Sequence, residues 1–147
     1  MPDHELVTPS DPTEWKAYHD IRRQVLFEAR GEFGTYDENH PDERAVGNHP
    51  KLLIYRGDPV GTIRIDIDGT TAILRRVAIR ADAQRHGHGR ILLLLAQRFA
   101  TENGCVKLAS FVAPDAVGFY RSFGFDIERD SAVGPSGRKS VYMIKGL

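Results

Sequence analysis

The chain of 147 residues has little cysteine, no long hydrophobic run and no net charge. Its one cysteine, Cys105, excludes an internal disulfide and a zinc site made of several cysteines. Its longest apolar run, Ile91–Ala96, is far below the ~20 residues that a membrane-spanning helix needs. Twenty basic side chains balance twenty acidic ones, which argues against general affinity for nucleic acid. We therefore expect a cytoplasmic protein with neither a membrane nor a nucleic-acid partner.

A metal site is not expected either, although the chain contains six histidines. His86 and His88 flank a glycine without a set of carboxylates or cysteines nearby, and His40 and His49 show no ligand spacing. Cys105 has no histidine beside it in the sequence, which favours a buried structural thiol over a nucleophile.

Apolar periodicity, together with glycine and proline signals, predicts one α+β domain that covers residues 1–147. Strands are expected at 5–8, 51–55, 59–67, 72–80, 106–112, 125–128 and 140–145, with loops at 31–50 and 130–138. Helices are expected after Asp11, around the apolar stripe Leu92–Phe99, and after Pro114. The unit from 72 to 112 is strand–helix–strand, which predicts a right-handed parallel crossover within a mixed sheet.

The turn before the second helix is unusual because it contains two glycines. Residues 84–90 are QRHGHGR and lead directly into the apolar run. Glycine destabilises a helix by about 0.5–1 kcal/mol relative to alanine, so its use here needs a reason. A helix start presents unpaired N–H groups and a partial positive charge, and Gly87 and Gly89 would let a ligand touch them. With Arg85 and Arg90 beside it, the turn predicts a phosphate site, although a tight strand-to-helix connection would also explain the glycines.

Two common phosphate-binding motifs do not fit this turn. The chain has no G-x-x-x-x-G-K-[ST] run, which excludes a mononucleotide P-loop. A dinucleotide fingerprint requires a third glycine where Leu92 stands, and no acidic residue follows the next strand near Phe111. A nucleotide-binding function is therefore not expected.

Two segments of the chain match signatures of a known family. Residues 84–89 have the pattern Q-x-x-G-x-G after the strand 74–79, and residues 116–125 are AVGFYRSFGF. The first segment resembles motif A of the GNAT superfamily, the acetyl-CoA-dependent N-acyltransferases, and the second resembles its later signature. The resemblance implies a three-layer α/β/α fold. Its sheet is mixed and mostly antiparallel, with one splayed parallel strand pair.

The resemblance also implies an acetyl-CoA site and no metal. Backbone amides of the turn would bind the pyrophosphate of coenzyme A, and the strand before it would pair with the pantetheine arm. A bulge on that strand is expected to aim an N–H at the thioester carbonyl. The residues expected to bind acetyl-CoA are Val77, Ala78, Ile79, Gln84, Arg85, His86, Gly87, His88, Gly89, Arg90, Phe119 and Tyr120.

Tyr120 matches the position of a tyrosine that often serves the family as a general acid, here to protonate the leaving thiolate. A purely structural role in packing is the alternative. Some members carry a glutamate as base on the motif A strand, but this chain has Ile73, Arg75 and Arg76 there. The base is therefore open among Glu28, Glu32, Asp66, His49 and a water chain that relays to one of them.

The expected function is transfer of an acetyl group from acetyl-CoA to a primary amine of a small molecule or peptide by direct attack. The two arginines on the motif A strand equally favour an anionic acceptor. Because an acid is missing from that strand, a non-catalytic acyl-CoA-binding sensor is the alternative. The acceptor is open among a polyamine, an amino acid, an antibiotic, a protein N-terminus and a lysine side chain. Family members are often dimers, so a homodimer is one possible assembly.

Overall fold

The computed structural model describes residues 3–133 and 139–147. Within these ranges the helices are α1 (Pro12–Leu26), α2 (His88–Glu102) and α3 (Val117–Ser122). The strands are β1 (His4–Val7), β2 (Asn48–Tyr55), β3 (Asp58–Asp68), β4 (Thr71–Ile79), β5 (Lys107–Val112), β6 (Asp126–Val133) and β7 (Lys139–Gly146). Short 3₁₀ turns lie at Glu28–Arg30, Pro41–Arg44, Ala81–Ala83 and Pro114–Ala116. None of the helices in the described ranges is long and apolar enough to span a membrane.

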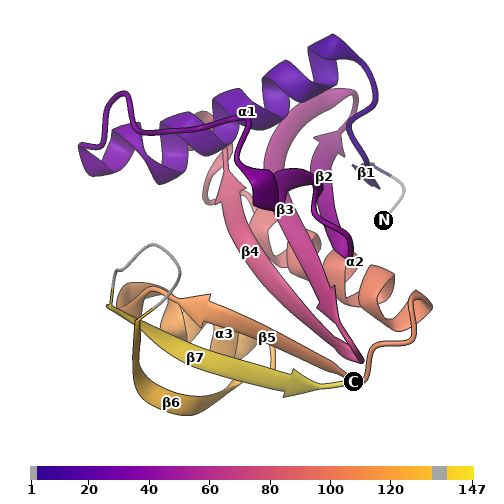
Figure 1. Cartoon of the computed structure of the whole chain (residues 1–147), viewed down its shortest axis with the longest axis vertical. Coiled ribbons are helices and arrows are strands. Elements are labelled where there is room, and N and C mark those ends of the chain that lie inside the picture. The colour runs from indigo at the N-terminus through magenta and orange to yellow at the C-terminus, as the bar shows by residue number, and fades with distance from the viewer. Residues whose placement is uncertain (1–2, 134–138) are drawn as a thin grey trace.

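The strands form one seven-stranded sheet in the order β1-β2-β3-β4-β5-β7-β6. The pair β4–β5 is parallel, and the other pairs are antiparallel. Parallel pairing runs only from Thr71 opposite Lys107 to Leu74 opposite Ser110. Beyond that point the two strands diverge, and the sheet opens into a fork (Figure 1). The predicted mixed sheet with a splayed parallel pair is therefore confirmed.

Helices cover both faces of the sheet and give three layers (Figure 1). On one face α1 packs Tyr18 and Ile21 against Leu52 of β2 and Ala78 of β4. On the other face α2 and α3 pack against a larger core, which includes Leu92, Leu93, Ala96, Tyr120 and Phe125. Burying a leucine or phenylalanine side chain contributes roughly 1.5–3 kcal/mol, so the α2 face supplies most of the apolar stabilisation.

Helix α1 begins where its sequence signals predict. The Asp11 side chain accepts a hydrogen bond from the Glu14 backbone N–H at 2.8 Å, and Pro12 occupies the first turn. A side-chain cap of this kind stabilises a helix by about 1 kcal/mol. The cap fixes the start of α1, and its apolar stripe then directs the helix onto the sheet.

Two predicted strand boundaries differ from the structure by more than one residue. Strand β2 begins at Asn48, inside the predicted loop 31–50, because residues 48–50 pair with residues 64–66 of β3. Strand β6 extends to Val133, into the predicted loop 130–138, and residues 134–138 of that prediction lie outside the described part of the chain. In the sheet β7 lies between β5 and β6, so the last two strands do not follow chain order.

Candidate active site

The turn from β4 into α2 is held in place by side chains that bond to the backbone and to the neighbouring hairpin. The Arg80 guanidinium donates to both carboxylate oxygens of Asp58, at 2.9 and 3.0 Å. The Gln84 side-chain amide donates to the Ile79 carbonyl at 3.0 Å. Arg85 and Gly87 adopt left-handed backbone conformations, with φ of 67° and 82°. These contacts fold the chain tightly, so that the start of α2 faces the end of β4.

The first turn of α2 leaves backbone donors free. Gly87 is the N-cap and offers no side-chain hydrogen bond, and the first turn holds no acidic residue. The first N–H groups of a helix have no partner within it and carry a partial positive charge. A glycine at the cap and another at position 89 keep side chains away from these donors. An anion is the ligand that such a helix start accepts best.

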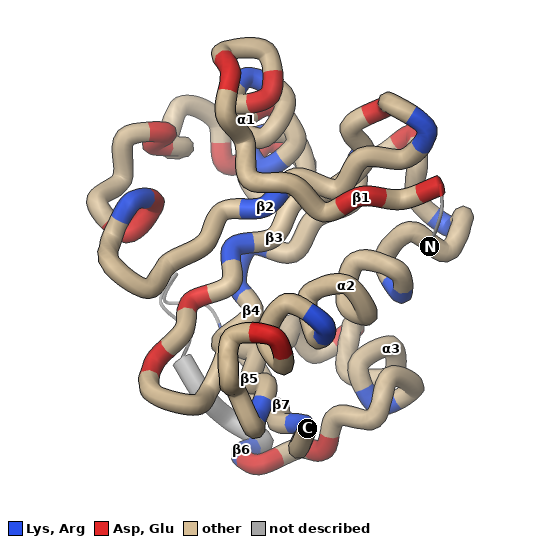
Figure 2. Tube along the Cα trace, turned by 90° about the vertical axis from the view of Figure 1, so that its right-hand side faces the viewer, with Lys and Arg blue, Asp and Glu red and all other residues tan. Residues whose placement is uncertain are grey.

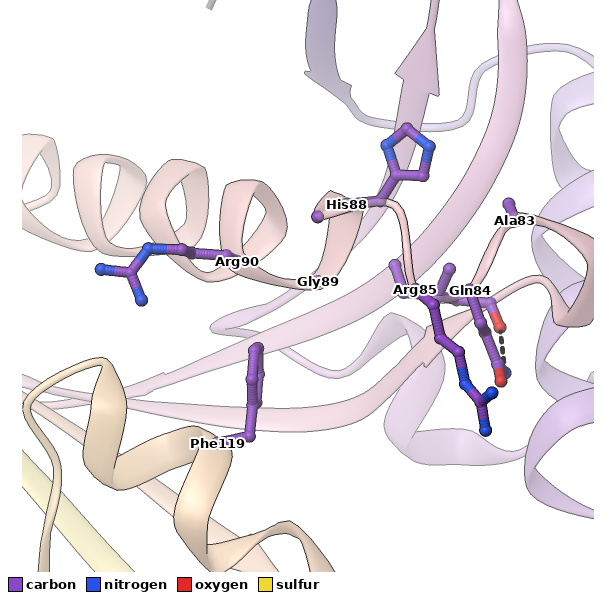
Figure 3. A pocket seen from close by; sticks show the side chains of 9 residues that line it. Ala83, Gln84, Arg85, His88, Gly89, Arg90 and Phe119 are labelled. Carbon is purple, nitrogen blue, oxygen red and sulfur yellow. Dashed lines mark hydrogen bonds between the residues drawn. The ribbon is translucent and has the colours of Figure 1, made fainter.

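A pocket of 280 Å³ lies against this helix start. It is lined by Ile79, Ala83, Gln84, Arg85, Gly87, His88, Gly89, Arg90 and Phe119, drawn in Figure 3. Phe119 packs directly against the turn, because a Cβ built on Gly89 would lie 3.4 Å from the Phe119 ring. The pocket thus unites the glycine-rich turn and the second signature, two segments that lie far apart in the sequence.

Not every predicted residue reaches the pocket with its side chain. The His88 ring points away from Phe119 (Figure 3), bonds to the His4 ring at 2.9 Å and packs on Tyr55. Burial, together with the nearby His86 and Arg80, lowers the pKa of His88, so the ring adds no positive charge at neutral pH. His86 is exposed and does not line the pocket. The two histidines therefore add no charge to the pocket, whose donors are backbone N–H groups and the arginines Arg85 and Arg90. No sequence signal predicted the contact between His88 and His4.

A β-bulge lies in β4 directly beyond the fork. Thr62 pairs with Ala78 and Arg64 with Arg75, so β4 has one more residue than β3 between these pairs. The extra residue bends the strand, and Arg76 takes a φ of 55°. At the base of the fork the Ser110 hydroxyl donates to the Leu74 carbonyl at 3.2 Å. The bulge stands where the resemblance predicts one, within two residues of the last parallel pair.

Tyr120 follows Phe119 in α3 and lies in the core on the α2 side of the sheet. Its ring meets Phe125 edge to face, with centroids 5.2 Å apart, and the side chain is buried. Burial raises the pKa of the Tyr120 phenol, and the Ser110 side chain acts in the opposite direction. The phenol is therefore protonated at neutral pH. Its side-chain hydrogen bond with Ser110 places it next to the fork.

The candidate bases lie in different surroundings. Both Asp66 oxygens are engaged by guanidiniums, at 2.8 Å from Arg64 Nε and 2.9 Å from Arg75 Nε. The His49 ring packs against Phe99 of α2, with centroids 5.1 Å apart, on the face opposite α1. Glu28 lies 3.5 Å from Arg23, and Glu32 follows in the loop after α1. Asp66 lies near the fork, since it pairs with Ile73, but both its oxygens are held by arginines. The contacts of the other three candidates place no base there, so the identity of the base stays a hypothesis.

A buried polar cluster on the α1 side was not anticipated from the sequence. The Tyr18 hydroxyl donates to Glu43 at 2.5 Å, and the Arg22 guanidinium bonds to both the hydroxyl and Glu43. All three residues are at most 4% exposed. Tyr18 and Arg22 are four residues apart on one helix face, which is a detectable spacing. Glu43 comes from the loop, and its pairing with Arg22 could not be predicted from the sequence.

Charged residues of both signs are interspersed along the chain (Figure 2). Among the described residues, no group of three or more His, Cys, Asp or Glu side chains gathers in a way that could hold a metal ion.

Comparison with known proteins identifies the family. The model of the acetyltransferase (GNAT) family matches residues 11–125. A protein of Bacillus subtilis (strain 168), named as an acetyltransferase by inference, is 29% identical over 111 residues, which cover 72% of each chain. The structure of an acyl-CoA N-acyltransferase from Pseudomonas aeruginosa has a TM-score of 0.81 at 15% identity, covering 98% of this chain and 99% of that one. The PaiA N-acetyltransferase from Thermoplasma acidophilum, solved in complex with coenzyme A, has a TM-score of 0.74 at 16% identity, with coverages of 98% and 99%.

The three-layer fold with a forked mixed sheet is that of the acyl-CoA N-acyltransferases. The chain belongs to the acetyltransferase (GNAT) family, and it is an enzyme of the N-acetyltransferase class. The resemblance drawn from residues 84–89 and 116–125 is confirmed.

Proposed function

We propose that the enzyme transfers an acetyl group from acetyl-CoA to a primary amine of a small molecule or peptide by direct attack. The observation that carries this proposal is the pocket at the start of α2, where unpaired N–H groups, a glycine-lined surface and Phe119 converge beside the fork. This donor set suits a diphosphate, and a related fold has been solved with coenzyme A. A cytoplasmic location, expected from the single cysteine, stays a prediction.

The residues of the site have separate roles in the reaction. When bound, acetyl-CoA supplies a thioester whose carbonyl carbon the neutral amine attacks, so that a C–N bond forms and the C–S bond breaks. The turn 84–90 holds the diphosphate. A backbone N–H of the bulge at Arg76–Val77 stabilises the developing oxyanion, an effect of roughly 3–4 kcal/mol where one such donor has been removed from other enzymes. Tyr120 donates its phenolic proton to the departing sulfur and regains one from solvent, and the proton lost by the amine goes to solvent or to a base.

A thiol-release assay with acetyl-CoA and a panel of amines tests the proposal. The panel includes a polyamine, free amino acids, amino acid amides and a lysine-containing peptide. We expect thiol release that depends on both acetyl-CoA and one class of amine, with an equal amount of N-acetylated product by mass spectrometry. A protein that binds desulfo-CoA in calorimetry but releases no thiol with any amine would instead be the non-catalytic sensor.

Replacement of Gly87 by alanine is expected to weaken coenzyme A binding by about tenfold or more. The added Cβ stands among the free donors, and loss of one hydrogen bond to a charged group costs about 1.5–3 kcal/mol. Gly104, at the other end of α2, provides a matched control. Its φ is 80° against 82° for Gly87, and a Cβ meets nothing within 4 Å at either position.

Both variants carry the same backbone strain, because alanine is disfavoured at positive φ. Their melting temperatures should therefore fall by similar amounts, while only Gly87→Ala loses affinity in calorimetry with coenzyme A. Equal affinity in the two variants would contradict binding at this turn.

A further inference from the structure

The bulge in β4 turns Arg76 onto the α1 side of the sheet. In a regular strand, residues two apart share a face, so Arg76 would lie beside Leu74 in the α2-side core. Instead Leu74 and Val77 both pack in that core, and Arg76 places its guanidinium 5.5 Å from the Phe27 ring after α1. One inserted residue thus exchanges a core position for a cationic side chain beside the fork.

Arg76 joins three other arginines on this side, and together they form a cluster of Arg22, Arg64, Arg75 and Arg76. Two carboxylates contact the cluster. Glu43 pairs with Arg22, and Asp66 is shared by Arg64 and Arg75. In the described ranges, the Arg76 guanidinium has neither a hydrogen bond nor an ion pair, so four guanidiniums face two carboxylates.

The electrostatic surroundings of Arg76 show the same excess of positive charge. Burial lowers the pKa of Arg76, and Arg22 and Arg64 lower it further against the opposite influence of Tyr36 and Glu43. An arginine nonetheless stays charged in proteins. A half-buried charge without a counter-ion is unfavourable, and a bound anion would remove that cost.

Arg76 is also close to the chemistry. It lies two residues past Leu74, the last residue of β4 that pairs with β5. The pocket at the start of α2 is lined by Ile79 and Phe119, on the face opposite α1. An amine that approaches the fork from the α1 side therefore passes the arginine cluster. This cluster repels a polyamine and attracts a molecule that carries a negative charge.

We propose that the acceptor is an amine that also carries a carboxylate, and that Arg76 binds this carboxylate and so orients the amine toward the fork. The inference rests on the proposed acetyl transfer. A guanidinium suits a carboxylate because it donates two parallel N–H bonds to the two oxygens. Free amino acids have this chemistry, and so do peptides whose C-terminal carboxylate lies close to the amine.

The test compares acceptors in matched pairs, each amino acid against its carboxamide, by kcat/KM for thiol release. We expect the wild-type enzyme to favour the carboxylate by about tenfold or more, as for a charge-assisted hydrogen bond. In Arg76→Gln this preference should fall to near unity, mainly through KM, with coenzyme A affinity unchanged. Arg98→Gln removes an exposed charge from α2 and should keep the preference. A preference for carboxamides or polyamines, or one that survives Arg76→Gln, would overturn the inference.

A second measurement separates this inference from the proposed function. Binding of N-acetyl amino acids and of their carboxamides is measured by calorimetry with coenzyme A present, so that no turnover is needed. If no amine releases thiol, but N-acetyl amino acids bind and Arg76→Gln abolishes their advantage over the carboxamides, the carboxylate site stands and the transfer reaction does not. If amines are acetylated and neither substrate nor product pairs show a carboxylate preference, the transfer reaction stands and the carboxylate site does not.

Discussion

The Tyr120→Phe enzyme is expected to turn over about 10²-fold more slowly than the wild type, with its affinity for coenzyme A unchanged. General acid catalysis contributes roughly 10²–10⁴-fold in enzymes. The phenol is the buried proton donor linked to Ser110 at the base of the fork, and burial keeps it protonated by raising its pKa. Phenylalanine fills the same space beside Phe125, so packing is retained. The measurement is kcat for thiol release at saturating acetyl-CoA.

The leaving group provides a sharper readout than the rate alone. A thioester whose thiol is more acidic needs less help from an acid, so the defect of Tyr120→Phe should shrink with such a donor. A packing role would lower the rate equally with both donors. Tyr55→Phe is the matched control, because it removes a tyrosine hydroxyl from β2, where the Tyr55 ring packs on His88. An unchanged kcat in Tyr120→Phe would exclude the acid role.

The sequence predicted best those features that depend on neighbouring residues. Gly87 and Gly89 marked the turn because a helix start rarely uses glycine without a structural need, and φ of 82° at Gly87 confirms that need. The alternation and turn signals located the strands to within a few residues. The parallel pair followed from the strand–helix–strand order, since such crossovers have a fixed hand.

Features that depend on contacts between distant segments were not predictable in this way. His88 was grouped with the phosphate site because of its position in the motif, yet its partner is His4, 84 residues away. Arg76 appeared as one of two adjacent arginines, and only the bulge decides that both face α1. A bulge has no composition signal of its own here, because its extra residue is an arginine rather than a glycine.

The success at the glycine turn and the failure at Arg76 have one physical origin. A turn is specified by local backbone preferences, whereas the side on which a residue lies depends on strand register. A shift of one residue in register moves a side chain to the other face of the sheet. In this enzyme the register shift falls at the fork, where the reaction would take place. The residues proposed to recognise the acceptor are therefore those whose environment the sequence encodes least directly.

The Glu43→Gln protein is expected to lose about 3–5 kcal/mol of unfolding free energy, measured by urea denaturation at neutral pH. Removal of one partner of a buried ion pair has this cost because the other charge is left without compensation. Arg22 is 4% exposed, and its Nε already has no hydrogen-bond partner. Glutamine can still accept from Tyr18 but carries no charge for Arg22. The exposed Glu38→Gln, in the same loop, should change stability by less than about 0.5 kcal/mol.

The pH dependence of this difference gives an independent check. Burial alone would raise the pKa of Glu43, but the charge and hydrogen bonds of Arg22 and a bond from Tyr18 lower it below 4.5. A carboxylate whose pKa is lowered by folding stabilises the protein above its unfolded pKa, and this stabilisation is lost as the pH falls through the folded pKa. The gap between wild type and Glu43→Gln should therefore be largest near neutral pH and shrink below about pH 4.5. Adding Arg22→Met should recover part of the loss, since neither charge of the Arg22–Glu43 pair then remains. A double variant as unstable as the sum of both single changes would contradict an interaction between the two residues.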